Sequence, residues 1–232
     1  MIERIRDLIV RPELAFREIA RDPKFLTPWL LSAFLLAFPM IAAVQRIGSV
    51  RLFGNVIALV EINPLLADQP QEVLYGAVEH LFDFLVIITP LLAIPLTAAC
   101  ILPMLPTLGT PRGTRLGTLF RPLMAVTAWA TLLPAAGMCV TMMIVLAVRD
   151  PQTLSLGSLT PFDLGILVPA SFSRVLHNIA STMEFFSMWS VYLLMEGIAA
   201  AAGVSFRRTF LWLALPLIVF AWIVAAVLSM LQ

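Results

Sequence analysis

The sequence predicts an all-α fold, a polytopic helical membrane bundle of about five transmembrane helices. Hydrophobic residues make up 60% of the 232-residue chain and charged residues only 12%, whereas soluble domains carry roughly 25% charged residues. The apolar residues gather in five runs long enough to cross a bilayer, and the cations are divided unevenly among the segments that join these runs. These observations indicate a single membrane domain embedded in lipid.

Residues 1–25 form an amphipathic segment ahead of the membrane domain, which covers residues 26–232. Apolar and charged side chains alternate here at helical spacing, and Pro12 suits the first position of a second short helix. We therefore expect two amphipathic helices. They either lie in the membrane interface or pack on the cytoplasmic ends of the spans. Because the segment is partly acidic and precedes the first apolar run, we expect no cleaved signal peptide.

The first span is expected at residues 28–44, between charged residues on both sides. Apolar character resumes after it, so the helix can extend beyond the bilayer until Asn63 and Pro64 end it.

The second span is expected at residues 81–105. Its three prolines, Pro90, Pro95 and Pro103, predict kinks that neighbouring helices must compensate. The following loop, PTLGTPRGTRLGTLFR, is rich in glycine, threonine and proline, so we expect no regular structure in it.

The third span is expected at residues 122–148, with Pro122 at the helix start and a kink at Pro134. Beyond it, Thr160, Pro161 and Asp163 have the character of a helix start. We expect a short amphipathic helix on the outer side of the membrane. Its apolar face would carry Leu164, Val168, Phe172, Val175 and Ile179, and its polar face Ser171, Arg174 and Asn178.

The fourth span is expected at residues 185–203, where Ser181 and Glu184 have the spacing of a capping box. Small residues at spacing four in this span, Gly197 with Ala201 and Ala199 with Gly203, permit close helix packing within the fold or in a homo-oligomer. A short basic turn separates it from the fifth span, at residues 209–230.

Charge orients these spans. With the N-terminus in the cytoplasm, eleven of the 15 cations face the cytoplasm, so the positive-inside rule holds for every short loop. All cations but one are arginine, which is typical of proteins from GC-rich bacterial genomes, so we expect the protein in the bacterial inner membrane. An odd number of spans would place the C-terminus outside. The cytoplasmic cations are Arg4, Arg6, Arg11, Arg17, Arg21, Lys24, Arg112, Arg115, Arg121, Arg207 and Arg208, and the outer ones are Arg46, Arg51, Arg149 and Arg174.

Glu196 is the clearest candidate for a functional residue. It lies about eleven residues into the fourth span, which places it mid-membrane to the inner half, and an ionisable group there is a functional candidate by default. One interpretation is a proton-linked or polar-substrate site. The other is a structural pair with Arg121, Arg207 or Arg208, or a protonated carboxyl bonded to a neighbouring carbonyl.

A second polar group lies near the outer face. His80 and Asp83 are one helical turn apart, and His177 and Glu184 can approach them from another element. These are metal-ligand residue types, but the two pairs are far apart in the sequence and lack a dense motif such as H-E-x-x-H. We therefore expect ordinary interfacial polar residues, with no bound metal and no cofactor.

The cytoplasmic arginines are candidates for anionic lipid headgroups, chiefly Arg112, Arg115 and Arg121. Arg207 and Arg208 are further candidates for headgroup binding. The alternative is that these arginines only set the orientation of the spans. The sequence has no G-x-S-x-G, no paired acids and no clustered histidines, so we expect no enzyme activity. We expect lipid and other membrane proteins as partners, and no nucleic acid.

The stretch from Met183 to Pro216 resembles the bacterial branch of the Yip family, the Ypt/Rab-interacting-protein domain. The matching positions hold Phe186, Trp189, Leu193, Leu194, Gly197, Gly203, Ser205 and Arg208. The opening LIVRPELAFREIARDPKFLTPWLL and the stretch RPLMAVTAWATLLPAAG resemble that family as well. The resemblance implies a five-span helical membrane domain.

The resemblance implies less about activity. Eukaryotic relatives carry a longer N-terminal region tied to small GTPases, and Glu196 departs from the small or apolar residue expected beside Gly197. The first hypothesis is a non-enzymatic membrane protein that organises membrane or partner proteins. The alternative is a small transporter or channel subunit that uses Glu196 and the kinked second span, and a lipid-modifying enzyme is the third.

Overall fold

The computed structural model describes residues 2–52, 71–108, 116–154, 156–159, 162, 164–168, 177, 180 and 184–215. Every regular element within these residues is a helix, which confirms the predicted all-α class. Four helices are long and apolar enough to cross a membrane, and only 22–33% of the residues in their most apolar stretches are buried by the protein itself. These helices therefore present most of their apolar surface outward, as lipid-embedded helices do. They are α3 (Leu26–Ile47), α6 (Gln71–Ile101), α7 (Leu116–Val148) and α9 (Phe185–Ala202).

The helix of the first span does not continue to Asn63 as expected. It ends at Gly48, whose φ of 88° lies in the left-handed region that favours glycine, and a separate short helix α4 (Ser49–Leu52) follows. Asn63 and Pro64 lie outside the described residues. The helix that carries the second span, α6, begins at Gln71, while its apolar stretch begins at Glu79, close to the predicted start. The helix is followed by the 3₁₀ helix η1 (Leu102–Leu108), and Pro90 and Pro95 lie inside α6.

The third span starts earlier than predicted. Helix α7 begins at Leu116, so Pro122 lies inside it and the last part of the expected loop is helical. The helix ends at Val148, and Asp150 then caps a short 3₁₀ helix, η2 (Pro151–Thr153), by accepting a hydrogen bond from the Gln152 N–H at 2.9 Å.

The start of the expected outer helix has a different conformation from the predicted one. Leu156–Leu159 (η3) and Leu164–Leu167 (η4) are 3₁₀ turns, and Val168 after η4 is a bend, whereas His177 and Ala180 further along are α-helical. Phe172, Val175, Ile179, Ser171, Arg174 and Asn178 lie outside the described residues.

The predicted capping box is wrong. Helix α9 begins at Phe185, so Glu184 is the residue before the first helical residue and not three residues inside, and its side chain accepts a hydrogen bond from Ser187 Oγ at 2.9 Å. The end is as predicted, because Gly203 stops the helix with a φ of 67°. The basic turn is partly helical, with α10 (Phe206–Thr209) followed by a π-helical turn, η5 (Phe210–Ala214). Residues 216–230 of the expected fifth span lie outside the described part.

The N-terminal segment forms two helices, α1 (Ile2–Val10) and α2 (Pro12–Arg21), with Pro12 in the first turn of α2 as predicted. We call these two helices the N-terminal pair. Helix α2 packs on α9 and α7, and Leu8, Phe16 and Ile19 are buried against the bundle. The sequence leaves two placements open for the N-terminal pair, in the membrane interface or on the ends of the spans. The structure shows the face with Leu8, Phe16 and Ile19 packed on the ends of the spans.

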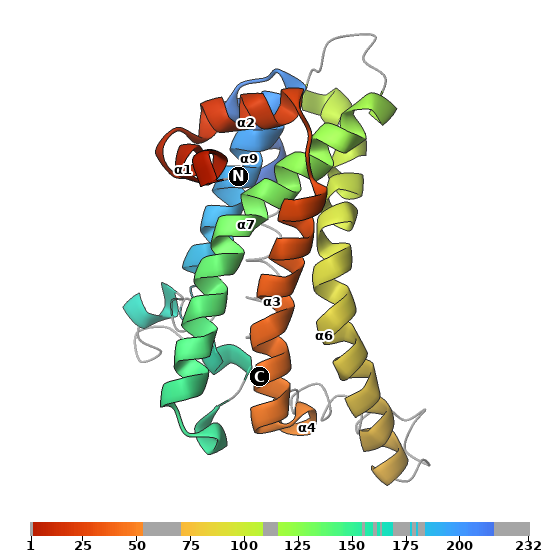
Figure 1. The fold of residues 1–232 in the computed structure, drawn as a ribbon, viewed down its shortest axis with the longest axis vertical. Helices are drawn as coiled ribbons and strands as arrows, with labels where there is room; N and C mark the ends of the chain where they lie inside the picture. The colour runs from red at the N-terminus through yellow and green to blue at the C-terminus, as the bar shows by residue number, and fades with distance from the viewer. Residues whose placement is uncertain are drawn as a thin grey trace.

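Helix α7 is the centre of the bundle and packs against α9 on one side and α3 on the other, with α6 next to α3 (Figure 1). The contact between α7 and α9 is close at two glycines. A Cβ added to Gly197 would lie 2.3 Å from Val126 Cγ1, and one added to Gly137 would lie 2.2 Å from Phe186 Cε1. Gly197 of the fourth span thus serves close packing within the fold.

Side chains of α3 and α7 donate hydrogen bonds to backbone carbonyls of neighbouring elements. Trp29 Nε1 donates to the Leu91 carbonyl of α6 at 3.0 Å, and Ser32 Oγ donates to the Ala128 carbonyl of α7 at 3.3 Å. Trp129 Nε1 donates to the Lys24 carbonyl at 3.1 Å, which ties α7 to the segment before α3. Interhelical hydrogen bonds of this kind add to the packing of helices in lipid.

The two ends of the bundle carry different sets of cations. The N-terminal pair, the end of α9 and the start of α7 lie at one end, at the top of Figure 1, and α4 and the start of α6 lie at the other. At the lower end Arg46 Nη2 donates to the Arg149 carbonyl at 3.5 Å, and Arg51 donates to the Gln152 carbonyl. The described cations thus separate into the two groups that the sequence predicts.

Candidate functional site

Glu196 lies on α9 where α2 crosses the end of the bundle. It lines an open cavity of about 810 Å³ whose other charged lining residues are Glu13, Arg17 and Arg21 of α2. We call this the α2–α9 cavity. The remaining lining residues are small or belong to the turn after α9: Ala20, Ala199, Ala200, Ala201, Gly203, Val204, Ser205 and Phe206. The carboxyl therefore borders a polar cavity at the end of the bundle that carries the N-terminal pair.

The expected arginine partners of Glu196 do not pair with it. Arg121, Arg207 and Arg208 are exposed, and no ion pair among the described residues includes Glu196. Arg17 Nη2 pairs instead with Glu13 Oε1 at 2.6 Å, one turn away on the same helix.

The α2 side of this cavity was not predicted from the sequence. Glu13, Arg17 and Arg21 are spaced four residues apart, so they lie along one face of an α-helix. That row was visible in the sequence, but its position over Glu196 follows from the docking of α2 on α9 through Phe16 and Ile19, which no local pattern reveals.

The structure does not bring the outer-face polar residues together. His80 and Asp83 lie exposed on α6, while Glu184 starts α9 on the opposite side of the bundle (Figure 1). His177 Nδ1 lies 2.7 Å from the Val168 carbonyl oxygen. Within the described part of the chain no three His, Cys, Asp or Glu side chains gather as a metal site would require.

Of the five arginines proposed for lipid headgroups, Arg112 and Arg115 lie outside the described residues. Arg121, Arg207 and Arg208 are exposed at the same end of the bundle as the N-terminal pair.

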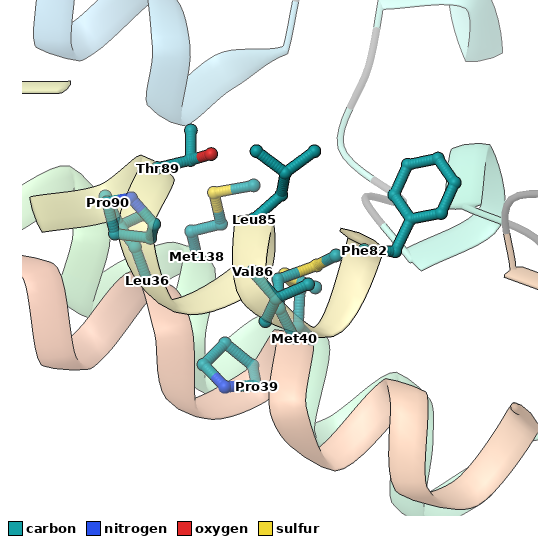
Figure 2. A pocket seen from close by; sticks show the side chains of 10 residues that line it. Leu36, Pro39, Met40, Phe82, Leu85, Val86, Thr89, Pro90 and Met138 are labelled. Carbon is teal, nitrogen blue, oxygen red and sulfur yellow. The ribbon is translucent and has the colours of Figure 1, made fainter. Parts of the chain in front are cut away.

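An apolar pocket of about 300 Å³ opens between α3, α6 and α7. Figure 2 shows the side chains of Pro39, Phe82 and Pro90 among those that converge on it, with the Thr89 hydroxyl as the one polar side-chain group of its lining. The other lining residues are Leu36, Met40, Leu85, Val86, Met138 and Met142. A pocket so poor in polar groups suits a hydrocarbon chain and cannot orient a polar substrate.

An ionic clamp ties α1 to the segment before α3. Asp22 Oδ2 lies 3.0 Å from Lys24 Nζ and 3.2 Å from Arg4 Nη2. The hydrogen bond from Lys24, with a smaller one from Arg4, holds the pKa of Asp22 below its usual value of 3.8. The clamp is therefore formed at neutral pH, and it is lost only as the pH falls below 3.8 through the lowered pKa.

Replacing Asp22 by asparagine should loosen α1 without unfolding the bundle. The ion pairs are solvent-exposed, so the loss is small and local. Amide hydrogen exchange in residues 2–10 should accelerate at pH 7, whereas exchange in α7 should stay as in the wild type. Asp7→Asn is the matched control, because among the described residues Asp7 pairs with its neighbour Arg6 alone and so joins no two elements. Equal exchange of α1 in both variants would contradict the clamp.

Comparison with known proteins identifies the family to which this helical bundle belongs. The sequence model of the Yip1 domain matches residues 6–227, from the N-terminal pair to the end of the last apolar run, as the resemblance of three separate stretches had indicated. No curated protein and no solved structure matches the chain. The helical bundle and the match over nearly the whole length agree, and the chain is an integral membrane protein that belongs to the Yip1-domain family.

Proposed function

We propose that this protein is a non-enzymatic membrane organiser whose N-terminal pair engages the cytoplasmic surface of the bacterial inner membrane. One observation carries the proposal. The N-terminal pair is apolar on two sides, of which one packs on the bundle and the other remains exposed.

The exposed side is concentrated where α1 meets α2. Ile9, Val10 and Leu14 are 59%, 66% and 50% exposed, and Ile2 is 83% exposed. Arg6 and Arg11 lie exposed beside them. Apolar side chains flanked by arginines are typical of helices that lie in a membrane interface with anionic lipids.

The distribution of charge supports the orientation. The N-terminal pair, Arg121, Arg207 and Arg208 share one end of the bundle, which would be the cytoplasmic end by the positive-inside rule. With a fifth crossing, the C-terminus would then lie outside. In this arrangement the pair rests on the cytoplasmic leaflet, where it can bind anionic headgroups or a neighbouring membrane protein.

A small transporter or channel subunit is the second candidate, favoured by the cavity at Glu196. It would need a polar route through the bundle, and the pocket between α3, α6 and α7 offers only the Thr89 hydroxyl. Loss of an ion-driven flux in Glu196→Gln proteoliposomes, at unchanged stability, would favour the transporter over the organiser.

A depth measurement tests the proposed contact with lipid. A bimane label at Val10→Cys, in protein whose Cys100 and Cys139 are replaced by alanine, should be quenched by spin-labelled lipids at a depth of about 5–10 Å below the headgroups. The matched control is Glu18→Cys, an exposed charged position of α2, which should remain in water. Equal quenching at the two positions would overturn the proposal.

A further inference from the structure

The α2–α9 cavity has charges that the fold itself leaves without partners. Arg17 is paired with Glu13 at 2.6 Å, but Arg21 and Glu196 form no ion pair among the described residues, although both line the same space. The charged groups of Arg21 and Glu196 lie more than 4.0 Å apart, so the cavity keeps these opposite charges separate. A ligand that carries both charges can satisfy them together.

The charge balance of the lining decides between ligand classes. Two guanidinium groups, Arg17 and Arg21, face two carboxyl groups, Glu13 and Glu196, so the lining has no formal net charge when all four are ionised. A purely anionic ligand would meet two carboxylates, and a purely cationic ligand would meet two guanidinium groups. The lining therefore favours a zwitterion, bound with its anionic end at the arginines and its cationic end at Glu196.

The depth of the cavity matches the headgroup layer of a bilayer. Glu196 is six residues from the end of α9 at Ala202, about 9 Å along the helix axis. One turn deeper on the same face is Tyr192, which is 42% exposed and packs edge-to-face on Phe206 with ring centroids 5.7 Å apart. Tyrosines at this level are typical of the membrane interface. A lipid whose headgroup enters the cavity would thus lay its glycerol region on this aromatic pair.

The residues that line the α2–α9 cavity leave room for a lipid headgroup. The α9 side consists of alanines, and Gly203 ends the helix with nothing within 4 Å of a Cβ added to it. The volume of about 810 Å³ lies within the roughly 300–1,000 Å³ that is usual for small-molecule sites.

We propose that the α2–α9 cavity binds the phosphoethanolamine headgroup of a membrane phospholipid. The phosphate accepts hydrogen bonds from Arg21 and from the free donors of Arg17, since a guanidinium matches phosphate geometry. The primary ammonium donates to the Glu196 carboxylate. A choline headgroup has no N–H to donate, and a glycerol headgroup has no cation to place at Glu196. This site does not depend on the insertion of Val10 or Leu14 into the membrane, because it uses different residues.

Native mass spectrometry of the full chain in detergent, titrated with dioleoyl phospholipids, tests the site. The wild type should bind the phosphatidylethanolamine more tightly than the phosphatidylglycerol or the phosphatidylcholine. Glu196→Gln should weaken phosphatidylethanolamine binding by about tenfold or more, the effect of losing one charge-assisted hydrogen bond, and should leave phosphatidylglycerol binding unchanged. Arg21→Gln should weaken all three, because each carries the phosphate.

Glu18→Gln is the matched control, since Glu18 is an exposed carboxylate of α2 that does not line the cavity. Arg21 is exposed, so its variant remains informative if Glu196→Gln fails to fold. A wild type without preference for phosphatidylethanolamine, or equal binding by Glu196→Gln and Glu18→Gln, would overturn the proposal. Displacement of the lipid by an equimolar amount of free phosphoethanolamine would also overturn the assignment to a lipid, because the acyl chains would then contribute nothing to the affinity.

Discussion

Replacing Gly197 by alanine is expected to lower the free energy of unfolding by about 1–3 kcal/mol, a large effect for one methyl group. The added Cβ would lie 2.3 Å from Val126 Cγ1 and 3.0 Å from Phe16 Cδ1, so α9 must move away from both α7 and α2. Val126 is β-branched on a helix and has little freedom to rotate. The expected loss can be measured by SDS titration of the folded protein in mixed micelles.

The contact can be isolated with two further variants. Val126→Ala removes the methyl groups that the new Cβ would meet, so Gly197→Ala should cost less in that background than in the wild type. Gly76 of α6 is the matched control, because a Cβ added there has nothing within 4 Å. Gly76→Ala should be neutral or slightly stabilising, since alanine is the better helix former. A Gly197→Ala protein as stable as Gly76→Ala would show that α9 and α7 are not this close.

The sequence predicts the helices much better than it predicts their ends. Long apolar runs separated by charges identify the four described spans, because a bilayer requires such runs. The positions of the helix ends depend on single residues, and a proline can either start a helix or lie inside it. Pro122 suits the start of a helix, yet α7 accommodates it in its interior, whereas Gly48 ends α3 although the apolar character continues beyond it. In lipid, the packing of neighbouring helices decides such cases.

The candidate site shows a similar division. Glu196 stands out in the sequence because an ionisable residue within a span is rare. Its neighbours in the cavity come from α2, more than 170 positions earlier in the chain, and they are brought there by the burial of Phe16 and Ile19. Non-local docking of this kind leaves no periodic signal, so Arg121, Arg207 and Arg208 are the only charged partners of Glu196 that the sequence analysis considers.

Replacing Trp29 by phenylalanine is expected to lower the free energy of unfolding by about 0.6–1.7 kcal/mol, the usual range for one hydrogen bond between helices in lipid. The reason lies in Pro95, which has no N–H, so the Leu91 carbonyl four residues earlier in α6 lacks its donor within the helix. Trp29 Nε1 supplies the missing donor at 3.0 Å. This is the compensation by a neighbouring helix that the prolines of the second span predict.

A double-mutant cycle tests that cause and effect. Pro95→Ala restores a backbone N–H that can bond to the Leu91 carbonyl, so Trp29→Phe should cost less in Pro95→Ala than in the wild-type protein. Trp129→Phe is the matched control. It removes a similar hydrogen bond, from Trp129 Nε1 to the Lys24 carbonyl, which has no connection to Pro95. Its cost should therefore be equal in the two backgrounds. If the losses from Trp29→Phe and Pro95→Ala simply add, the tryptophan does not compensate the proline, and the Leu91 carbonyl must be satisfied by the α6 backbone itself.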